Sequence, residues 1–342
     1  MNAGVAHRIR LAGGEIEFSC AAGDTLLRAA QRAGLGFPYE CNVGSCGNCK
    51  FELLEGDVSS AWPEAPALSD KDRQRKRHLG CQTLALSDCV IKLRPAVRYV
   101  PPHRPQRGGA TLTGLRALTH DISEFSFTLD QAQLFEPGQY ALAWLPGVAG
   151  PRAYSMSNVA DSAGGQVWDL QVRRVPGGQG SECLFALQPG ARIEIDGPYG
   201  MAWLRREVAR DILCLAGGSG LAPMVSIARA AMLEPRLARQ QLHFIYGGRT
   251  LADLCGKDLL RRLPGWGERL FYHPFISTPA AVDDAVQVPQ AFVHEAALQL
   301  FGPRLPQMEV YFAGPPAMAN AVQRMLLDAQ VPPEQQHFDP FY

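Results

Sequence analysis

The stretch Cys41-Asn-Val-Gly-Ser-Cys46-Gly-Asn-Cys49 decides how the rest of this sequence is interpreted. Three cysteines lie close together among small residues, and Cys81 follows at a distance. The spacing C-x4-C-x2-C with a distant fourth cysteine is that of plant-type [2Fe-2S] clusters, in which four thiolates hold two irons. Small residues between the ligands let backbone amides turn inward and donate hydrogen bonds to sulfur. The sequence therefore predicts that Cys41, Cys46, Cys49 and Cys81 are metal ligands.

A structural zinc site is the alternative, because zinc also takes four thiolates. Zinc ligands usually come as two short Cys-x2-4-Cys pairs, whereas three of the ligands here share one glycine-rich loop. The pattern therefore favours an iron–sulfur cluster. The chain has nine cysteines, an odd number that argues against a disulfide framework. Five of them lack ligand spacing and are interpreted as buried bystanders: Cys20, Cys89, Cys183, Cys214 and Cys255.

Composition sets broad limits on the protein. With 342 residues the chain is long enough for two or three domains. Lys plus Arg and Asp plus Glu both total 33, so there is no basic surplus of the kind that drives nucleic-acid binding. The N-terminus carries Arg8, Arg10 and Glu15 and no apolar segment, so we expect no signal peptide and a cytoplasmic location.

One uncharged stretch approaches the length of a membrane span. Residues 212–228 carry no Asp, Glu, Lys or Arg. Glycines and Pro223 interrupt the stretch, so it is predicted to form a strand, a loop and a helix. We therefore expect no membrane contact.

The chain divides into four segments that differ in composition and in hydrophobic pattern. Residues 1–95 alternate short apolar runs with one helical pattern and are predicted to form a small α+β unit. Residues 96–108 lack periodicity, are rich in proline and basic residues, and read as a semi-rigid linker. Residues 109–205 show short strand patterns between Pro-Gly and Gly-Gly turns, typical of an antiparallel barrel. Residues 206–342 alternate apolar strands with helices, typical of a parallel α/β sheet.

The expected elements are specific enough to be checked. In the first unit we expect strands at 9–11, 16–18, 51–54 and 90–93, and a helix at 25–33 with Asp24 as its N-cap. In the last unit we expect strands at 212–216, 242–246, 270–275 and 310–313, and helices at 221–233, 251–263, 290–300 and 317–329.

A basic run, Lys71-Asp-Arg-Gln-Arg-Lys-Arg77, precedes Cys81. It either presents a basic face near the cluster to an acidic partner or forms a solvated helix surface. The sequence leaves both interpretations open.

Two motifs in the barrel segment indicate a flavin. Arg152-Ala-Tyr154-Ser155 resembles the RxYS motif of the ferredoxin-NADP reductase superfamily, and Gly178-Gln-Gly-Ser181 resembles its GxxS motif. The resemblance implies that Arg152 binds the pyrophosphate, that Tyr154 packs on the isoalloxazine and that Ser155 approaches flavin N5. A guanidinium group pairs well with phosphate oxygens, and an aromatic ring stacks well on a flat cofactor. The roles of Arg152 and Tyr154 therefore agree with the chemistry of their side chains.

FAD is favoured over FMN because Ser181 is expected beside a pyrophosphate. The predicted catalytic residues are Tyr154 and Ser155. The predicted flavin-binding residues are Arg152, Tyr154, Ser155, Val172, Gly178, Gly180 and Ser181.

The last segment carries nicotinamide signatures. Gly217-Gly-Ser-Gly220-Leu-Ala-Pro223 follows an apolar strand and opens a helix, where backbone N–H groups face an anion. It resembles the GGxGxxP loop of the same superfamily. Ala313-Gly-Pro-Pro-Ala-Met318 resembles the superfamily's CGPPxM segment, with alanine in place of cysteine. The predicted nucleotide-binding residues are Gly217, Gly218, Gly220, Pro223, Gly247, Arg249, Asp253, Gly314, Pro315 and Met318.

Two further expectations concern the nucleotide donor and the C-terminal residues. NADH is favoured over NADPH by the resemblance, by Asp253 near the expected adenosine ribose, and by the lack of a second basic residue beside Arg249. The chain ends in Phe341-Tyr342, and a terminal aromatic residue often covers the flavin in this superfamily. The alternative is that these aromatic residues only close the core.

The order of the segments resembles the reductase components of bacterial multicomponent aromatic-ring oxygenases, in particular those of carbazole dioxygenase and toluene monooxygenase. This resemblance implies a β-grasp ferredoxin domain, an antiparallel Greek-key flavin barrel and a parallel α/β nicotinamide domain. It implies an enzyme that passes electrons from NADH through FAD and a [2Fe-2S] cluster to a terminal oxygenase or an intermediate ferredoxin. The alternatives are a reductase of the same architecture that serves a non-oxygenase acceptor and a non-enzymatic electron carrier or zinc-stabilised binding module.

Overall fold

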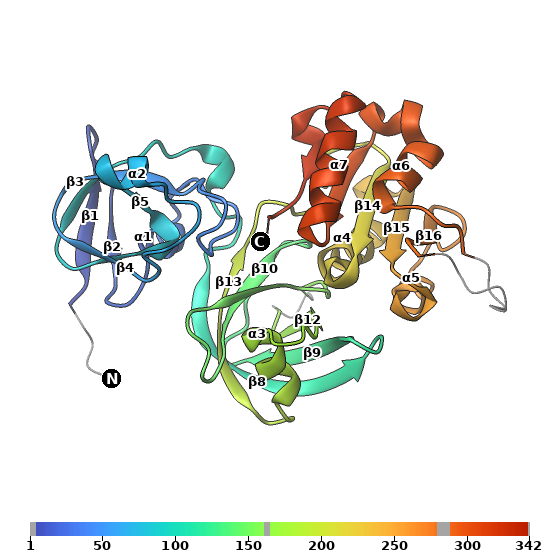
Figure 1. Ribbon diagram of the computed structural model, residues 1–342, viewed down its shortest axis with the longest axis horizontal. Coiled ribbons are helices and arrows are strands. Elements are labelled where there is room, and N and C mark those ends of the chain that lie inside the picture. Colours follow the sequence, from blue (N-terminus) through green and yellow to red (C-terminus); the bar gives the residue numbers. More distant parts are fainter. Residues whose placement is uncertain (1–4, 161–164, 279–287, 341–342) are drawn as a thin grey trace.

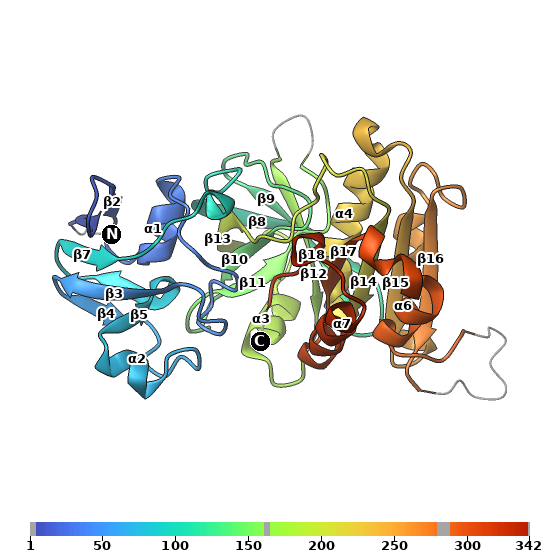
Figure 2. The ribbon, with the colours of Figure 1, turned by 90° about the horizontal axis from the view of Figure 1, so that it is seen from above.

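The computed structural model describes residues 5–160, 165–278 and 288–340. Three units, each built around its own sheet, follow one another in chain order from left to right in Figure 2. The C-terminal end of the described chain returns to the centre of the molecule, where the three units approach one another (Figure 1). The expectation for Phe341 and Tyr342 falls outside the described residues.

The N-terminal unit is a mixed sheet with the strand order β2-β1-β7-β3-β5. Strand β1 pairs antiparallel with β2 and parallel with β7, and helix α1 packs Leu26, Leu27 and Ala30 into the core, as in a β-grasp fold. A separate strand pair, β4 and β6, and the short helix α2 complete the unit. The elements are β1 His7–Leu11, β2 Glu17–Cys20, α1 Leu26–Arg32, β3 Lys50–Glu55, β4 Val58–Ser60, α2 Asp70–Gln74, β5 Arg77–Leu79, β6 Thr83–Ala85 and β7 Cys89–Lys92.

The middle unit is an antiparallel barrel with the strand order β11-β10-β13-β8-β9-β12. A bridge between Met156 and Leu170 links its two edge strands and nearly closes it. Strand β8 begins at Gln106, inside the predicted linker, because Gln106 already pairs with Gly197 of β13. The elements are β8 Gln106–Ala117, β9 Ile122–Leu129, β10 Tyr140–Trp144, β11 Arg152–Ser155, β12 Val167–Arg173, α3 Gln179–Ala186 and β13 Arg192–Tyr199.

The C-terminal unit is a parallel sheet with the strand order β16-β15-β14-β17-β18. Helices α4 and α5 pack on one face, and α6 and α7 pack on the other (Figure 1). The uncharged stretch 212–228 forms β14, a turn and most of α4, as predicted. The elements are β14 Ile212–Gly217, α4 Leu221–Leu233, β15 Leu242–Gly248, α5 Lys257–Leu260, β16 Leu270–Ile276, α6 Val293–Phe301, β17 Glu309–Ala313, α7 Pro316–Asp328 and β18 Gln336–His337.

Two expectations for helices were wrong in detail. The N-cap of α1 is Thr25, whose hydroxyl accepts from the Arg28 backbone N–H at 3.5 Å, whereas Asp24 pairs with Arg32 at 3.0 Å. The predicted helix at 251–263 is broken into a 3₁₀ turn at Leu251–Asp253 and the short α5. Gly256 lies between them with a φ of 93°, a left-handed conformation that an α-helix does not contain.

Candidate functional site

The four predicted ligand cysteines converge in the N-terminal unit. Cys41, Cys46 and Cys49 lie on the loop between α1 and β3, and Cys81 lies on a 3₁₀ turn between β5 and β6. The Sγ atoms of Cys49 and Cys81 are 3.4 Å apart. Cys41, Cys49 and Cys81 are buried, whereas Cys46 is half-exposed. Of the four predicted ligands, Cys46 is therefore the one most accessible to solvent.

The loop backbone stabilises a thiolate. The Cys41 Sγ accepts from the backbone N–H groups of Val43, Ser45 and Cys46 at 3.5, 3.4 and 3.3 Å. A hydrogen bond from the Cys46 thiol and these amides lower the pKa of Cys41 to about 5, although burial opposes the shift. Gly44 and Gly47 make the turn with φ values of 92° and 80°. Four thiols with inward-facing amides fit a [2Fe-2S] cluster.

The barrel holds the segment that precedes Cys41. The Tyr140 hydroxyl donates to the Glu40 carbonyl at 2.9 Å, and the Gly200 backbone N–H donates to the Tyr39 hydroxyl at 3.0 Å. In the C-terminal segment, the Asp339 carboxylate accepts from the Met201 backbone N–H at 2.9 Å. A continuous chain of contacts thus joins the cluster loop to the barrel and to the C-terminal segment.

A cavity of about 800 Å³ opens between the barrel and the carboxyl ends of β14 and β17. The C-terminal residues Phe338, Asp339 and Pro340 also line it. It contains most of the predicted flavin and nucleotide residues: Arg152, Tyr154, Ser155, Val172, Gly178, Gly180, Ser181, Gly217, Gly218, Gly220, Pro223, Gly314 and Pro315.

Arg152 and the N-terminus of α3 lie together at one electropositive end of this cavity. The Arg152 guanidinium donates only to backbone carbonyls in the described chain, the nearest being that of Ala149 at 2.9 Å, so its charge is uncompensated. A Cβ at Gly180 would lie 2.8 Å from Arg152 Cγ and 2.9 Å from the Tyr154 hydroxyl. Glycine therefore allows Arg152 and Tyr154 to lie against the helix N-terminus, where a pyrophosphate is favoured.

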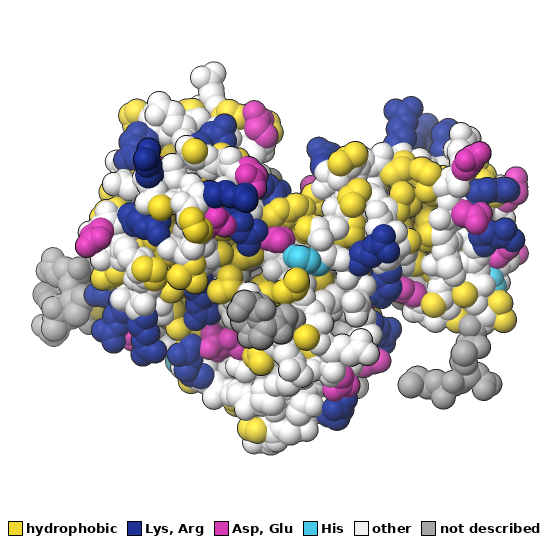
Figure 3. Space-filling model, turned by 180° about the vertical axis from the view of Figure 1, so that it is seen from behind, with side chains coloured by type: hydrophobic (Ala, Val, Ile, Leu, Met, Phe, Trp, Pro, Cys, Tyr) yellow, Lys and Arg dark blue, Asp and Glu magenta, His cyan; other side chains and the backbone are white. Residues whose placement is uncertain are grey.

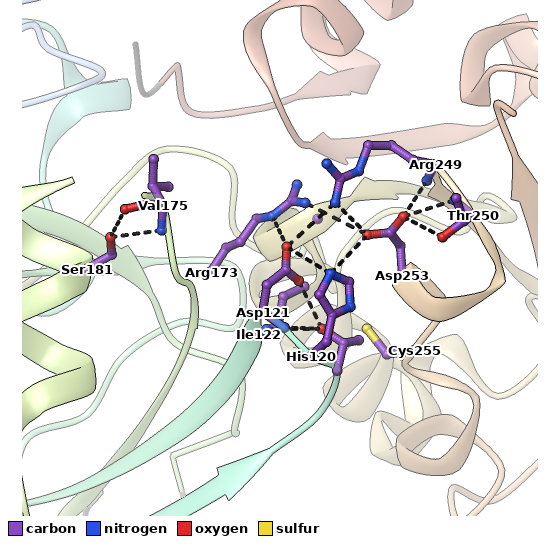
Figure 4. Close-up of polar contacts among 12 residues, drawn as sticks. His120, Asp121, Ile122, Arg173, Val175, Ser181, Arg249, Thr250, Asp253 and Cys255 are labelled. Atoms are coloured by element: carbon purple, nitrogen blue, oxygen red, sulfur yellow. Dashed lines mark hydrogen bonds and ion pairs between the residues drawn. The ribbon is translucent and has the colours of Figure 1, made fainter. Parts of the chain in front are cut away.

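Ser181 lies in the cavity wall but has another local role. Its hydroxyl accepts from the Val175 backbone N–H at 3.0 Å (Figure 4). The same hydroxyl donates to the Gly178 carbonyl at 3.1 Å. The hydroxyl thus closes the turn before α3. The backbone N–H groups of α3 and Arg152 are the groups left for phosphate.

A second cavity, of about 440 Å³, continues from the first over the ends of β14 and β15. Gly247, Arg249, Asp253 and Met318 line it, and Arg173, Gly217, Gly218 and Pro315 line both cavities. Strands β15 and β17 flank β14 on opposite sides, so the junction is the switch point where parallel sheets bind ligands. A Cβ at Gly220 would lie 2.0 Å from the Ala313 carbonyl oxygen, so only glycine fits that turn.

A charge cluster that the sequence did not predict closes the rim of the second cavity (Figure 4). The barrel contributes His120, Asp121 and Arg173, which meet Arg249 and Asp253 of the C-terminal unit. Arg173 Nε pairs with Asp121 at 2.6 Å, and Arg249 Nη2 pairs with Asp253 at 2.8 Å. Cross pairs of 3.7 to 3.8 Å, Arg249 to Asp121 and Arg173 to Asp253, join the two units.

Both carboxylate oxygens of Asp253 already have partners within the protein. One oxygen accepts from the backbone N–H groups of Arg249 and Thr250 at 3.1 and 2.9 Å, and the other pairs with the Arg249 side chain. Burial opposes ionisation, but hydrogen bonds from Arg249 and Thr250 outweigh it and lower the pKa of Asp253 to about 2. Its contact with a ribose stays a prediction.

The bystander cysteines lie apart from the ligand loop. Cys20, Cys89 and Cys214 are buried as predicted, whereas Cys183 and Cys255 are only half-buried. The Cys255 thiol donates to the Tyr246 hydroxyl at 3.3 Å. Every cysteine in the described chain is free.

The comparisons with known proteins follow the same division. Residues 9–86 match the 2Fe-2S iron-sulfur cluster binding domain, residues 109–203 the oxidoreductase FAD-binding domain, and residues 214–324 the oxidoreductase NAD-binding domain. These matches confirm the fold class and the three predicted cofactors at the level of domain families. No helix in the described part of the chain is long and apolar enough to cross a membrane.

Relatives match along the whole chain. The ferredoxin–NAD(P)(+) reductase CarAd of Metapseudomonas resinovorans is 40% identical over 338 residues, which are 96% of this chain and 98% of the relative. The reductase component of the alkene monooxygenase system of Xanthobacter autotrophicus is 37% identical over 332 residues, 95% and 97% of the two chains. The solved ferredoxin reductase in carbazole 1,9a-dioxygenase superposes with a TM-score of 0.89 at 36% identity, over 99% of each chain. The chain belongs to the ferredoxin–NAD(P)(+) reductases that combine a 2Fe-2S, an FAD-binding and an NAD-binding domain in one polypeptide.

Proposed function

We propose that this chain is the NADH-dependent reductase component of a multicomponent oxygenase system that hydroxylates an aromatic substrate. It passes electrons from NADH through FAD and a [2Fe-2S] cluster to a separate protein, either a Rieske dioxygenase, a diiron monooxygenase or an intermediate ferredoxin. The observation that carries the proposal is the junction of the two cavities at Gly217, Gly218 and Pro315, beside a barrel that contacts the cluster loop.

FAD, when bound, supplies the conversion between two-electron hydride chemistry and the single-electron chemistry of a cluster. In our proposal Arg152 and the N-terminus of α3 bind its pyrophosphate, and Tyr154 and Ser155 bind its ring. Burial raises the pKa of Tyr154 well above the usual value for tyrosine, so the side chain stays a neutral phenol against the ring.

The chain's own residues set the geometry for NADH. Gly217 and Gly220 bring the backbone close to the cavity junction, because side chains there would collide with Met318 and the Ala313 carbonyl. The anionic Asp253 and Asp121 at the rim favour a ribose hydroxyl over a 2′-phosphate. Arg249, whose charge is paired with these carboxylates, is less available to a phosphate. NADH is therefore the proposed donor. The free cysteines also fit the proposed cytoplasmic location, where thiols stay reduced.

The names of the relatives leave the acceptor class open, because they include a carbazole 1,9a-dioxygenase reductase, an alkene monooxygenase reductase and the phenol 2-monooxygenase reductase of Pseudomonas. The test is reconstitution of the purified chain with candidate oxygenases. We expect one of them to give substrate-dependent NADH oxidation coupled to a hydroxylated product. A protein without FAD, or without acid-labile sulfide when freshly purified, would contradict the proposal.

A further inference from the structure

The cluster loop has a covered side and an open side. The barrel contacts Tyr39 and Glu40, immediately before Cys41. On the other side Cys46 is half-exposed and Asn48 is exposed. An electron acceptor therefore has access to the loop from the side of Cys46.

A tryptophan lies against the open side. Trp62 is 42% exposed, although its ring packs on the loop so closely that a Cβ at Gly44 would lie 3.0 Å from it. The Ala67 backbone N–H donates to the Gly44 carbonyl at 3.4 Å, so the segment from 62 to 68 braces the loop. Tryptophan is enriched among the residues that contribute most to binding at the centres of protein interfaces.

The adjoining surface is basic. Arg73 of α2 donates to the Pro63 carbonyl at 2.6 Å and to the Leu68 carbonyl at 3.2 Å, which ties α2 to the tryptophan segment. Lys71, Arg73, Arg75, Lys76 and Arg77 are all exposed. The run holds one carboxylate, Asp72, which is buried and pairs with Lys50 and Arg77. The exposed Asp70, just before the run, pairs with Arg73 at 3.7 Å. In Figure 3 the N-terminal unit lies at the right of the view, and Lys and Arg side chains gather along its upper edge.

We propose that Trp62 and the cations of residues 71–77 form the docking face for an acidic electron-acceptor protein. The inference rests on the proposed function, because it assumes that electrons leave through the cluster. Trp62 supplies the apolar contact at the centre, and the cations steer the acceptor to the Cys46 side of the loop. The basic run that the sequence singled out thereby has a role beyond a solvated helix surface.

The test uses cytochrome b5 as an acidic acceptor and cytochrome c as a basic one, with the holoenzyme and NADH at low and high salt. The double variant Lys71→Glu/Arg75→Glu removes cations for which the described chain shows no ion pair. We expect its second-order rate constant with cytochrome b5 to fall about tenfold at low salt, and its rate with cytochrome c to rise. The matched control is Arg10→Glu/Arg94→Glu, two exposed cations outside this face, and we expect it to change the two rates by less than twofold.

Trp62→Ala tests the apolar contact, and Trp62→Phe is the conservative control. We expect the alanine variant to lower the cytochrome b5 rate severalfold at all salt concentrations and the phenylalanine variant to retain most of it. The visible cluster spectrum and flavin bleaching by NADH should be unchanged in every variant. Unchanged cytochrome b5 rates in the double variant, or equal losses in its control, would overturn the docking face alone. If NADH bleaches the wild-type flavin but neither cytochrome is reduced, the proposed function fails and the docking face with it.

Discussion

Cys81 is the predicted ligand whose position depends most on the fold, because it lies 32 positions after Cys49 in the sequence. The structure brings the two sulfurs to 3.4 Å. We predict that Cys81→Ser makes the cluster labile, since one iron loses a thiolate. Flavin bleaching by NADH should survive, and electron delivery to the oxygenase should fall to near background.

Visible and EPR spectra of the reduced protein check this prediction. The control is Cys89→Ser, which removes a buried thiol of the same unit that is not a predicted ligand. A Cys81→Ser protein with an intact cluster spectrum and full support of the oxygenase would show that Cys81 is not a ligand.

Asp253 and Arg249 are predicted to set the preference for NADH. The carboxylate is anionic across the physiological range because its pKa is about 2. NADPH should therefore have a kcat/KM at least about tenfold lower than NADH, and Asp253→Asn should narrow the difference. Asp258→Asn, on the exposed start of α5, should not. Equal kcat/KM values for both nucleotides in the wild type would contradict the assignment.

Because Asp339 is buried, we predict that the free energy of unfolding depends on pH. Burial raises the pKa of Asp339 to about 7, against hydrogen bonds from the Met201 and Ala202 amides. A carboxyl group whose folded-state pKa is raised binds its proton more tightly in the folded state. The free energy of unfolding should therefore fall as pH rises from about 4 to 7, by up to ~1.4 kcal/mol per pH unit from this group. Asp339→Asn should flatten that slope in urea titrations, and an identical slope in the variant would exclude this source.

At the scale of elements, helix α3 carries the Gly178-Gln-Gly-Ser181 motif at its N-terminus, beside the cavity that Arg152 lines. Gly180→Ala is predicted to weaken FAD binding at least about tenfold, because the new Cβ would displace Arg152 and Tyr154 from the helix N-terminus. Fluorescence titration of the apoprotein with FAD measures the affinity. Gly108→Ala in β8, where a Cβ has open space, is the matched control. Equal affinities for both variants would remove α3 from the binding site.

Elements with strong local patterns were predictable, and those that depend on distant contacts were not. Strands β14, β15, β16 and β17 and helix α4 fell where apolar periodicity placed them, whereas the two-residue strand β18 was not predicted. The predicted helix at 251–263 is not continuous, because Gly256 has a left-handed backbone conformation that the apolar pattern does not reveal. The pair Arg173–Asp121 joins residues 52 positions apart, so no sequence spacing indicated it. The convergence of both carboxylates on one cavity rim appears only when the barrel meets the sheet.

At the scale of the whole molecule, an ion pair fixes the N-terminal unit on the barrel. Arg32 of α1 forms a bidentate contact with Asp196 of β13 at 2.7 and 2.8 Å, and Asp196 is fully buried. Removal of one partner of a buried pair costs about 3 to 5 kcal/mol, because the other charge is left uncompensated. The orientation of the cluster loop relative to the flavin cavity therefore depends on this pair.

Arg32→Gln is predicted to loosen the N-terminal unit. Small-angle scattering should show a larger radius of gyration, and cluster reduction by NADH should slow while flavin reduction does not. Arg8→Gln removes an exposed ion pair with Asp88 inside the same unit and is the control. An Arg32→Gln protein with unchanged scattering and unchanged cluster reduction would show that other contacts hold the units together.

Anaerobic rapid mixing of the holoenzyme with NADH, followed across the visible spectrum, tests the central claim most directly. We predict that flavin absorbance bleaches first and that cluster absorbance bleaches second, with the EPR signal of a reduced [2Fe-2S] cluster at the end. Flavin that bleaches while the cluster stays oxidised, or a cluster that is reduced without the flavin, would contradict the proposed electron path.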